Sequence, residues 1–194
     1  MFITNSYLGD THGKYKYLFY MLYQDYNDTQ MSFMKDIDNL LTSFARNLGK
    51  NSAVVRPFVD DIGHTRQEIL DKAWSEDAQH EIMNTPGMLM LNVNLAHFDP
   101  NDNPWFYFHF GSRADERNLP HVVRLDTIEK ATDIFRQLEV FANVSNIDIF
   151  EEAKRMRTSK TSEALGIFEA KPGVFGFSVD LIKGFEFVKG LFKK

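Results

Sequence analysis

The chain of 194 residues contains no cysteine, which excludes disulfide bonds, thiolate zinc sites, iron–sulfur clusters and thiol catalysis. No apolar run reaches the roughly 18 residues of a membrane-spanning helix. Residues 1–6 lack the basic and apolar regions of a signal peptide. The chain also lacks an excess of positive charge: its net charge is −5, so no global basic field would attract nucleic acid. We therefore expect a soluble, cytoplasmic protein that binds no nucleic acid.

Aromatic residues, by contrast, are plentiful. The chain has 18 phenylalanines within a hydrophobic content of 43%, and 25% of its residues are charged. These proportions are typical of a folded globular protein rather than a disordered one. Most of the phenylalanines must be buried, because so much exposed aromatic surface would drive association. The length suits one domain with an appendage.

Apolar periodicity in the first part of the chain predicts a strand, a helix and a second strand. Residues 15–23 carry aromatic and aliphatic side chains in both alternating sets, which is typical of a central strand covered on both faces. A helix begins at Asp28 or Thr29, and we expect Gly49 to end it with a positive φ. Its apolar positions recur every three or four residues: Met34, Ile37, Leu41, Phe44 and Leu48. Residues 53–55 form the next strand.

The pattern then predicts a helical segment, a hairpin and a last helix. Thr65 and Glu68 form a capping box that opens a helix, with a second helical stretch from Ser75 to about residue 83. Strands at 88–95 and 105–110, joined by the turn-rich loop 97–104, read as a long-looped hairpin. Asp126 and Glu129 are a second capping pair, which starts a helix that ends near Asn143.

The predicted order across residues 15–143 is thus β-α-β-α-β-β-α. Thr85-Pro86, just before an apolar strand, resembles the cis-proline turn of thioredoxin-like proteins, whose core has the same element order. The resemblance covers about two thirds of the chain and implies a thioredoxin-like, three-layer α/β core. It also implies that redox cysteines would lie within residues 24–29, which contain none. We therefore expect the protein to be inactive in disulfide exchange.

We divide the chain into an α/β domain at 1–143 and an appendage at 144–194. The appendage is predicted to contain a short helix after Asn146, a further strand at 174–179 and an amphipathic helix at 181–194. The apolar stripe of that last helix consists of Leu181, Ile182, Phe185, Val188 and Phe192. Three interpretations remain open: it docks on its own domain or a sister subunit, it lies on a membrane surface, or the natural chain continues beyond it.

Two histidine-containing segments are candidates for chemistry. His109 falls on the same side of its strand as Trp105, which predicts a satisfied, partly buried core histidine. The string Gly9-Asp10-Thr11-His12-Gly13 resembles the first metal motif of calcineurin-like metallophosphoesterases. A metal site of that kind would use Asp10 and His12, with Asp60 and His64 further along the chain. The later motifs of that family are absent, and a capped loop explains the string equally well.

The preferred hypothesis is a non-catalytic, redox-inactive protein-binding or regulatory module without a cofactor. Its partner would be another protein or a second copy of the chain, and its groove would lie beside the proline turn. The residues predicted to form this surface are Asp25, Tyr26, Asn27, Thr85, Pro86 and Trp105. The alternatives are a divergent metal-dependent phosphoesterase and a protein recruited to membranes by its C-terminal helix.

Overall fold

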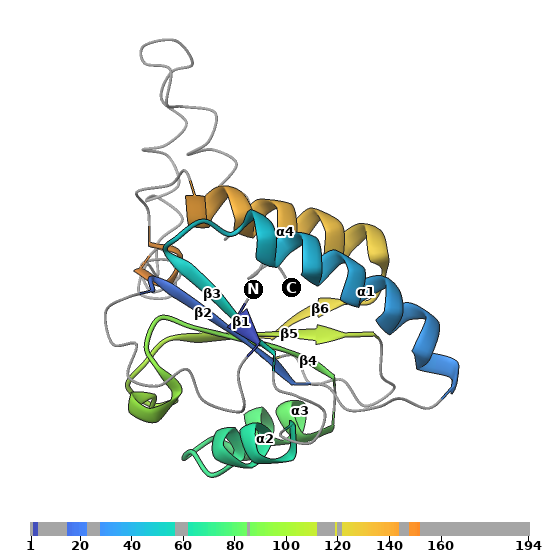
Figure 1. The fold of residues 1–194 in the computed structure, drawn as a ribbon. Coiled ribbons are helices and arrows are strands. Elements are labelled where there is room, and N and C mark those ends of the chain that lie inside the picture. The colour runs from blue at the N-terminus through green and yellow to red at the C-terminus, as the bar shows by residue number, and fades with distance from the viewer. Residues whose placement is uncertain are drawn as a thin grey trace, which may run out of the picture.

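The structure is a computed structural model, and it describes residues 2–3, 15–22, 28–56, 62–84, 86–111, 119, 122–143 and 148–151. Within these residues the chain forms one mixed sheet with helices on both faces (Figure 1). The predicted strand at 174–179 and helix at 181–194 lie outside the described residues.

The sheet has six strands in the order β1-β3-β2-β4-β5-β6. Parallel pairing joins β1 to β3, β3 to β2 and β5 to β6, whereas β4 is antiparallel to both β2 and β5. The strands are β1 (Phe2–Ile3), β2 (Tyr17–Leu22), β3 (Ser52–Arg56), β4 (Gly87–Leu91), β5 (Trp105–Phe110) and β6 (Val122–Leu125). The mixed α/β class predicted from the sequence is confirmed.

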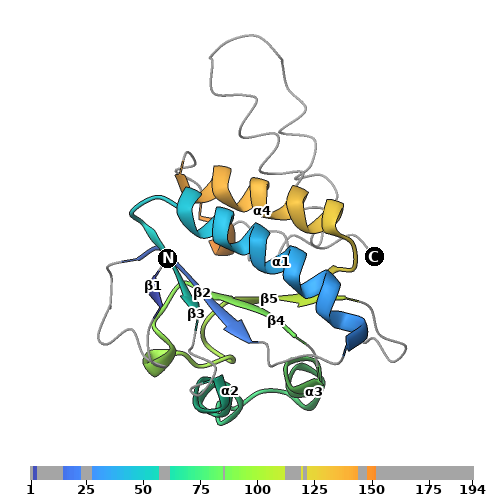
Figure 2. The same cartoon turned by 45° about the vertical axis from the view of Figure 1, so that its right-hand side comes forward.

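Two pairs of helices cover the sheet. Helices α1 (Asp28–Asn47) and α4 (Ile128–Asn143) lie side by side over one face in Figures 1 and 2. Helices α2 (Ile62–Leu70) and α3 (Glu76–Asn84) lie on the opposite face. A short 3₁₀ helix, η2 (Leu95–His97), follows β4.

Strand alternation divides the apolar side chains between two cores. On β5, Phe106 and Phe108 face α1 and α4, whereas Trp105 and Tyr107 face α2 and α3. The central strand β2 is buried at every position, as the sequence predicted. The predicted stripe of α1 is also confirmed, since all five of its apolar residues are buried.

Several predicted boundaries were wrong. The capping box fails because α2 begins at Ile62, so that Thr65 lies inside the helix and is fully buried. Gly49 does not adopt a positive φ; among the described glycines, Gly111 does, at 94°. Strands β1 and β6 were not predicted, because two and four residues are too few to show a period.

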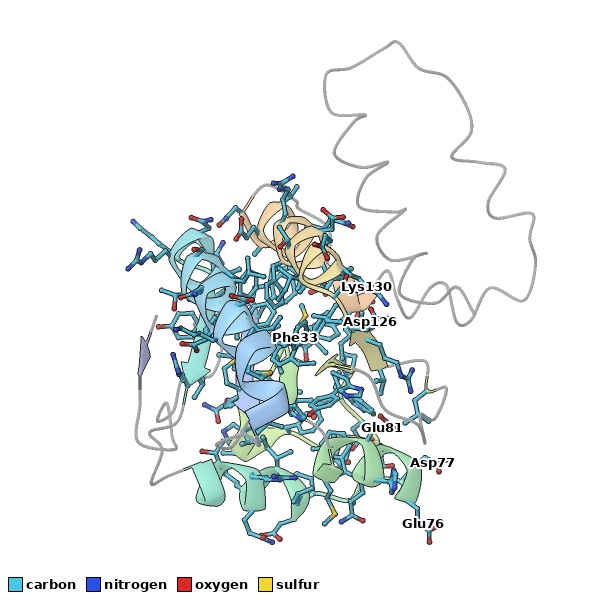
Figure 3. The ribbon with its side chains drawn as sticks, turned by 90° about the vertical axis from the view of Figure 1, so that its right-hand side faces the viewer. Phe33, Glu76, Asp77, Glu81, Asp126 and Lys130 are labelled. Atoms are coloured by element: carbon cyan, nitrogen blue, oxygen red, sulfur yellow. The ribbon has the colours of Figure 1, made fainter. Side chains whose placement is uncertain are left out.

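The start of α4 also differs from the predicted capping pair. The Oγ1 atom of Thr127 accepts the N–H of Lys130 at 3.2 Å, which makes Thr127 rather than Asp126 the capping residue. Asp126 instead accepts a hydrogen bond from Lys130 Nζ at 3.1 Å, and Figure 3 shows the two side chains together. Partial burial raises the pKa of Asp126. The hydrogen bonds from Lys130 and from backbone N–H groups outweigh this rise and hold the pKa of Asp126 below its usual value.

Asn143 joins the C-terminal ends of α1 and α4. Its Nδ2 atom donates to the carbonyl of Asn47 at 2.5 Å, and its Oδ1 atom accepts the N–H of Gly49 at 2.6 Å. A Cβ on Gly49 would collide with this side chain, so glycine is needed here for close approach rather than for a left-handed backbone. The contact satisfies a carbonyl that the end of α1 leaves without a helical partner.

The C-terminal described segment packs against the central strand. The hydroxyl of Tyr17 accepts the N–H of Ile149 at 3.2 Å, and both are buried. Phe150 stacks on Phe106 at a centroid distance of 5.5 Å and packs at a tilt against Tyr17. Residues beyond 143, the predicted domain boundary, therefore contribute to the main core.

We predict that Tyr17→Phe lowers the free energy of unfolding by about 1–3 kcal/mol at pH 8, because the buried N–H of Ile149 loses its acceptor. Burial raises the pKa of Tyr17 well above its ordinary value of 10.0, and the Ile149 N–H offsets part of this rise. The unfolded chain ionises first, so the wild type loses stability as the pH rises past that ordinary value, by about 1.4 kcal/mol per pH unit. Urea unfolding of the wild type and of Tyr17→Phe at several alkaline pH values measures both free energies of unfolding. The difference between them should narrow as the pH rises, and a constant difference would contradict the prediction.

Candidate binding site

A hollow of about 150 Å³ opens at the edge of the molecule where two loops meet the start of β5. One loop joins α2 to α3, and the other is the predicted turn-rich loop between β4 and β5. The lining residues are Trp74, Ser75, Ala78, Pro100, Asn101, Trp105 and Leu119. Three distant stretches of sequence thus supply its walls.

The two tryptophans of the chain meet at this hollow. The rings of Trp74 and Trp105 pack edge to face, with their centroids 4.9 Å apart and their planes at 89°. Trp74 is held further by its indole N–H, which donates to the carbonyl of Ile69 at 2.6 Å, and by a tilted contact with Phe98. Its ring is therefore fixed without any ligand.

Hydrogen bonds also fix the loop wall. Asn101 donates from Nδ2 to the carbonyl of Ala73 at 3.1 Å, which ties the β4–β5 loop to the α2–α3 loop. Inside the loop, Asp99 Oδ1 accepts the N–H of Asn101 at 2.8 Å, and Asn103 Oδ1 accepts the N–H of Asp99 at 2.8 Å. Ser75, where the second helical stretch was predicted to begin, caps α3, because its Oγ accepts the N–H of Ala78 at 3.3 Å. These bonds give the hollow a preformed shape.

Acidic residues are concentrated on the two segments that supply most of the walls of the hollow. Residues 71–78 and 98–105, which supply most of its walls, carry five carboxylates and one ammonium group, that of Lys72. The carboxylates are Asp71, Glu76, Asp77, Asp99 and Asp102, and all five residues are exposed. Figure 3 shows Glu76 and Asp77 pointing away from the body of the molecule. These five exposed carboxylates flank the lining residues in sequence, and we call them the acidic rim.

A separate set of charged and polar side chains is buried beneath α3. Glu81 is fully buried, and its Oε1 atom lies 3.9 Å from Nη2 of Arg124 on β6. Figure 3 shows Glu81 directed toward the sheet. His109 pairs with Arg124 across the β5–β6 ladder and is 1% exposed, so it is a core histidine, as predicted, and is buried more deeply than the prediction had it. A carboxylate inside the protein requires such a cation, and the pair links α3 to the edge of the sheet.

The structure separates two residues of the predicted binding surface. Pro86 precedes Gly87, which pairs with His109, while Trp105 pairs with Leu91 at the other end of the same ladder. The carbonyl of Pro86 already accepts the N–H of Phe110 at 2.9 Å. The other four residues of that surface, Asp25, Tyr26, Asn27 and Thr85, lie outside the described part of the chain.

The remaining predicted sites fall mostly on residues that are not described. Asp10, His12 and Asp60 are among these, as is the side chain of His64, and so is the whole apolar stripe from Leu181 to Phe192. Within the described residues, no three metal-binding side chains come together. In that same part of the chain, no helix is both long and apolar enough to cross a membrane.

Sequence reasoning found one wall of the hollow and missed the others. Trp105 was chosen, but Trp74, Asn101 and Leu119 were not. A tryptophan at a helix end and a loop rich in Asn, Asp and Pro were visible signals. Only the fold shows that they meet.

Comparison of the chain with family models, with curated proteins and with solved structures finds no match.

We predict that Arg124→Met destabilises the protein by about 3 kcal/mol, because the carboxylate of Glu81 stays buried without this cation. The double variant Glu81→Leu, Arg124→Met should recover much of that loss, since it removes both charges and leaves apolar side chains in their place. Chemical unfolding of the wild type, both single variants and the double variant completes the cycle. Additive losses in the double variant would show that the two residues do not act as a pair.

Proposed function

We propose that this protein is a non-catalytic protein-binding module, and that the hollow between Trp74 and Trp105 receives one side chain of its partner. The observation that carries the proposal is the meeting of both tryptophans at one preformed hollow. Tryptophan is enriched among the residues that dominate binding energy, because its ring is large and rigid and loses little entropy.

The size of the hollow supports a peptide side chain over a cofactor. Sites for drug-sized ligands and cofactors usually measure about 300–1,000 Å³. At about 150 Å³, this hollow is well below that range. Its walls come from loops held on a rigid sheet, an arrangement common in recognition sites.

We also propose that the core is thioredoxin-like. The four central strands have the order β3-β2-β4-β5, with β2 and β3 parallel and β4 antiparallel to its two neighbours, which supports the resemblance. The pairing of α1 with α4 on one face and of α2 with α3 on the other supports it further. Without cysteine, such a core retains binding and loses disulfide exchange.

Three earlier hypotheses remain predictions. Metal-dependent phosphoester hydrolysis depends on Asp10, His12, Asp60 and His64. Self-association and membrane recruitment both depend on the stripe from Leu181 to Phe192. None of these side chains is among those described.

The test is selection of peptides from a displayed random library on the full chain, followed by affinity measurement with Trp74→Leu. We expect the selected peptides to lose at least about tenfold in affinity for the variant, because truncating a central aromatic residue of an interface typically costs 2 kcal/mol or more. Met83→Ala is the matched control, since Met83 is exposed on α3 but does not line the hollow.

A second variant guards against a folding defect in the first. In Leu119→Phe, a larger side chain is placed at a partly buried lining position while Trp74 is unchanged. Circular dichroism and urea unfolding establish that each variant is folded. Selected peptides that bind both variants as tightly as the wild type would overturn the proposal, as would a selection that yields no binder.

A further inference from the structure

We infer that the side chain received by the hollow is cationic, and that arginine fits it best; this inference rests on the proposed function. Three observations on the described residues carry it. They are the two indole rings, the acidic rim and the hydrogen-bonding state of Asn101. Together they identify a basic segment of a protein partner as the ligand.

The indole rings provide the first argument. Tryptophan attracts a cation over its face more strongly than the other aromatic residues do, and the attraction grows where water is excluded. Trp105 is 6% exposed and Trp74 is half-buried, so a side chain in the hollow meets rings that are largely shielded from water. The hollow is thus suited to the flat guanidinium group, which stacks on aromatic faces.

The rim provides the second argument. Five carboxylates and one ammonium group on the two wall segments give a local charge of −4 (1 − 5 = −4), which is most of the −5 of the whole chain. Such a concentration attracts basic peptides and repels acidic ones. An apolar ligand would gain nothing from it.

Asn101 provides the third argument. Its amide nitrogen has two hydrogens, and Nδ2 donates to the carbonyl of Ala73 and to Oδ1 of Asp99, each at 3.1 Å. What this side chain can offer a ligand is therefore its oxygen, which is an acceptor. A guanidinium group carries five N–H donors and no acceptor, so it complements this wall. A carboxylate or phosphate ligand has only acceptor oxygens at neutral pH, and the oxygen of Asn101 could not donate a hydrogen bond to it.

The experiment titrates the full chain with three capped tripeptides, acetyl-Gly-Xaa-Gly-amide, in which Xaa is arginine, lysine or citrulline. Citrulline has nearly the shape of arginine without its charge. Both tryptophans lie at the hollow, so intrinsic fluorescence and the two indole N–H resonances report binding there directly. We expect the arginine peptide to bind at least about fivefold more tightly than the citrulline peptide, and added salt to reduce this difference.

Charge variants of the rim provide matched controls. Asp102→Asn and Glu76→Gln each remove one exposed carboxylate of the rim. Each should lower the affinity for the arginine peptide by about two- to fivefold and leave the affinity for the citrulline peptide unchanged. Glu129→Gln removes an exposed carboxylate from α4, on the opposite side of the sheet, and should change the affinity for neither peptide.

The outcomes separate this inference from the proposed function. Equal binding of arginine and citrulline overturns the cationic ligand but keeps the hollow as a binding site. If neither tripeptide binds while library-selected peptides still depend on Trp74, the cationic ligand is again overturned and the proposed function stands. If the selected peptides do not depend on Trp74 either, both fail.

Discussion

The structure depends on the burial of β2 on both faces. Each of its six side chains is buried, so the strand needs an apolar layer above and below it. Its two tyrosines face opposite layers: the hydroxyl of Tyr17 accepts the N–H of Ile149, and that of Tyr20 accepts the N–H of Leu95, both at 3.2 Å. A buried hydroxyl is stable only with such partners. The central strand therefore also fixes the positions of two segments that are distant in sequence.

The position of the hollow follows from this constraint. Because β2 needs cover on both faces, α2 and α3 must cross the face opposite α1 and α4. The turn between them then falls beside the start of β5, where the β4–β5 loop also arrives. Backbone groups in loops require partners, and here Asn101 supplies one across the two loops. The hollow is what remains between two loops that are each held by their own hydrogen bonds.

The sequence predicted the features that depend on local periodicity. The stripe from Met34 to Leu48 and the alternation in residues 105–110 were visible because burial repeats with the period of each element. Thr65 misled because a capping pattern is local, whereas its burial against the sheet is a tertiary effect. Half of the site was unpredictable for the same reason. Nothing in the sequence around Trp74 indicates that it will meet Trp105, thirty-one positions away (105 − 74 = 31).

The buried ion pair and the hollow are mechanically connected through α3. Ala78 lines the hollow near the start of this helix, and Glu81, one turn further on, is held toward Arg124 on the sheet. The same helix is also held by Ala78 and Ile82, which are buried in the core on this face of the sheet. The buried charges are thus best understood as positioning groups. They cost free energy to bury, and their pairing offsets part of that cost while joining α3 to β6.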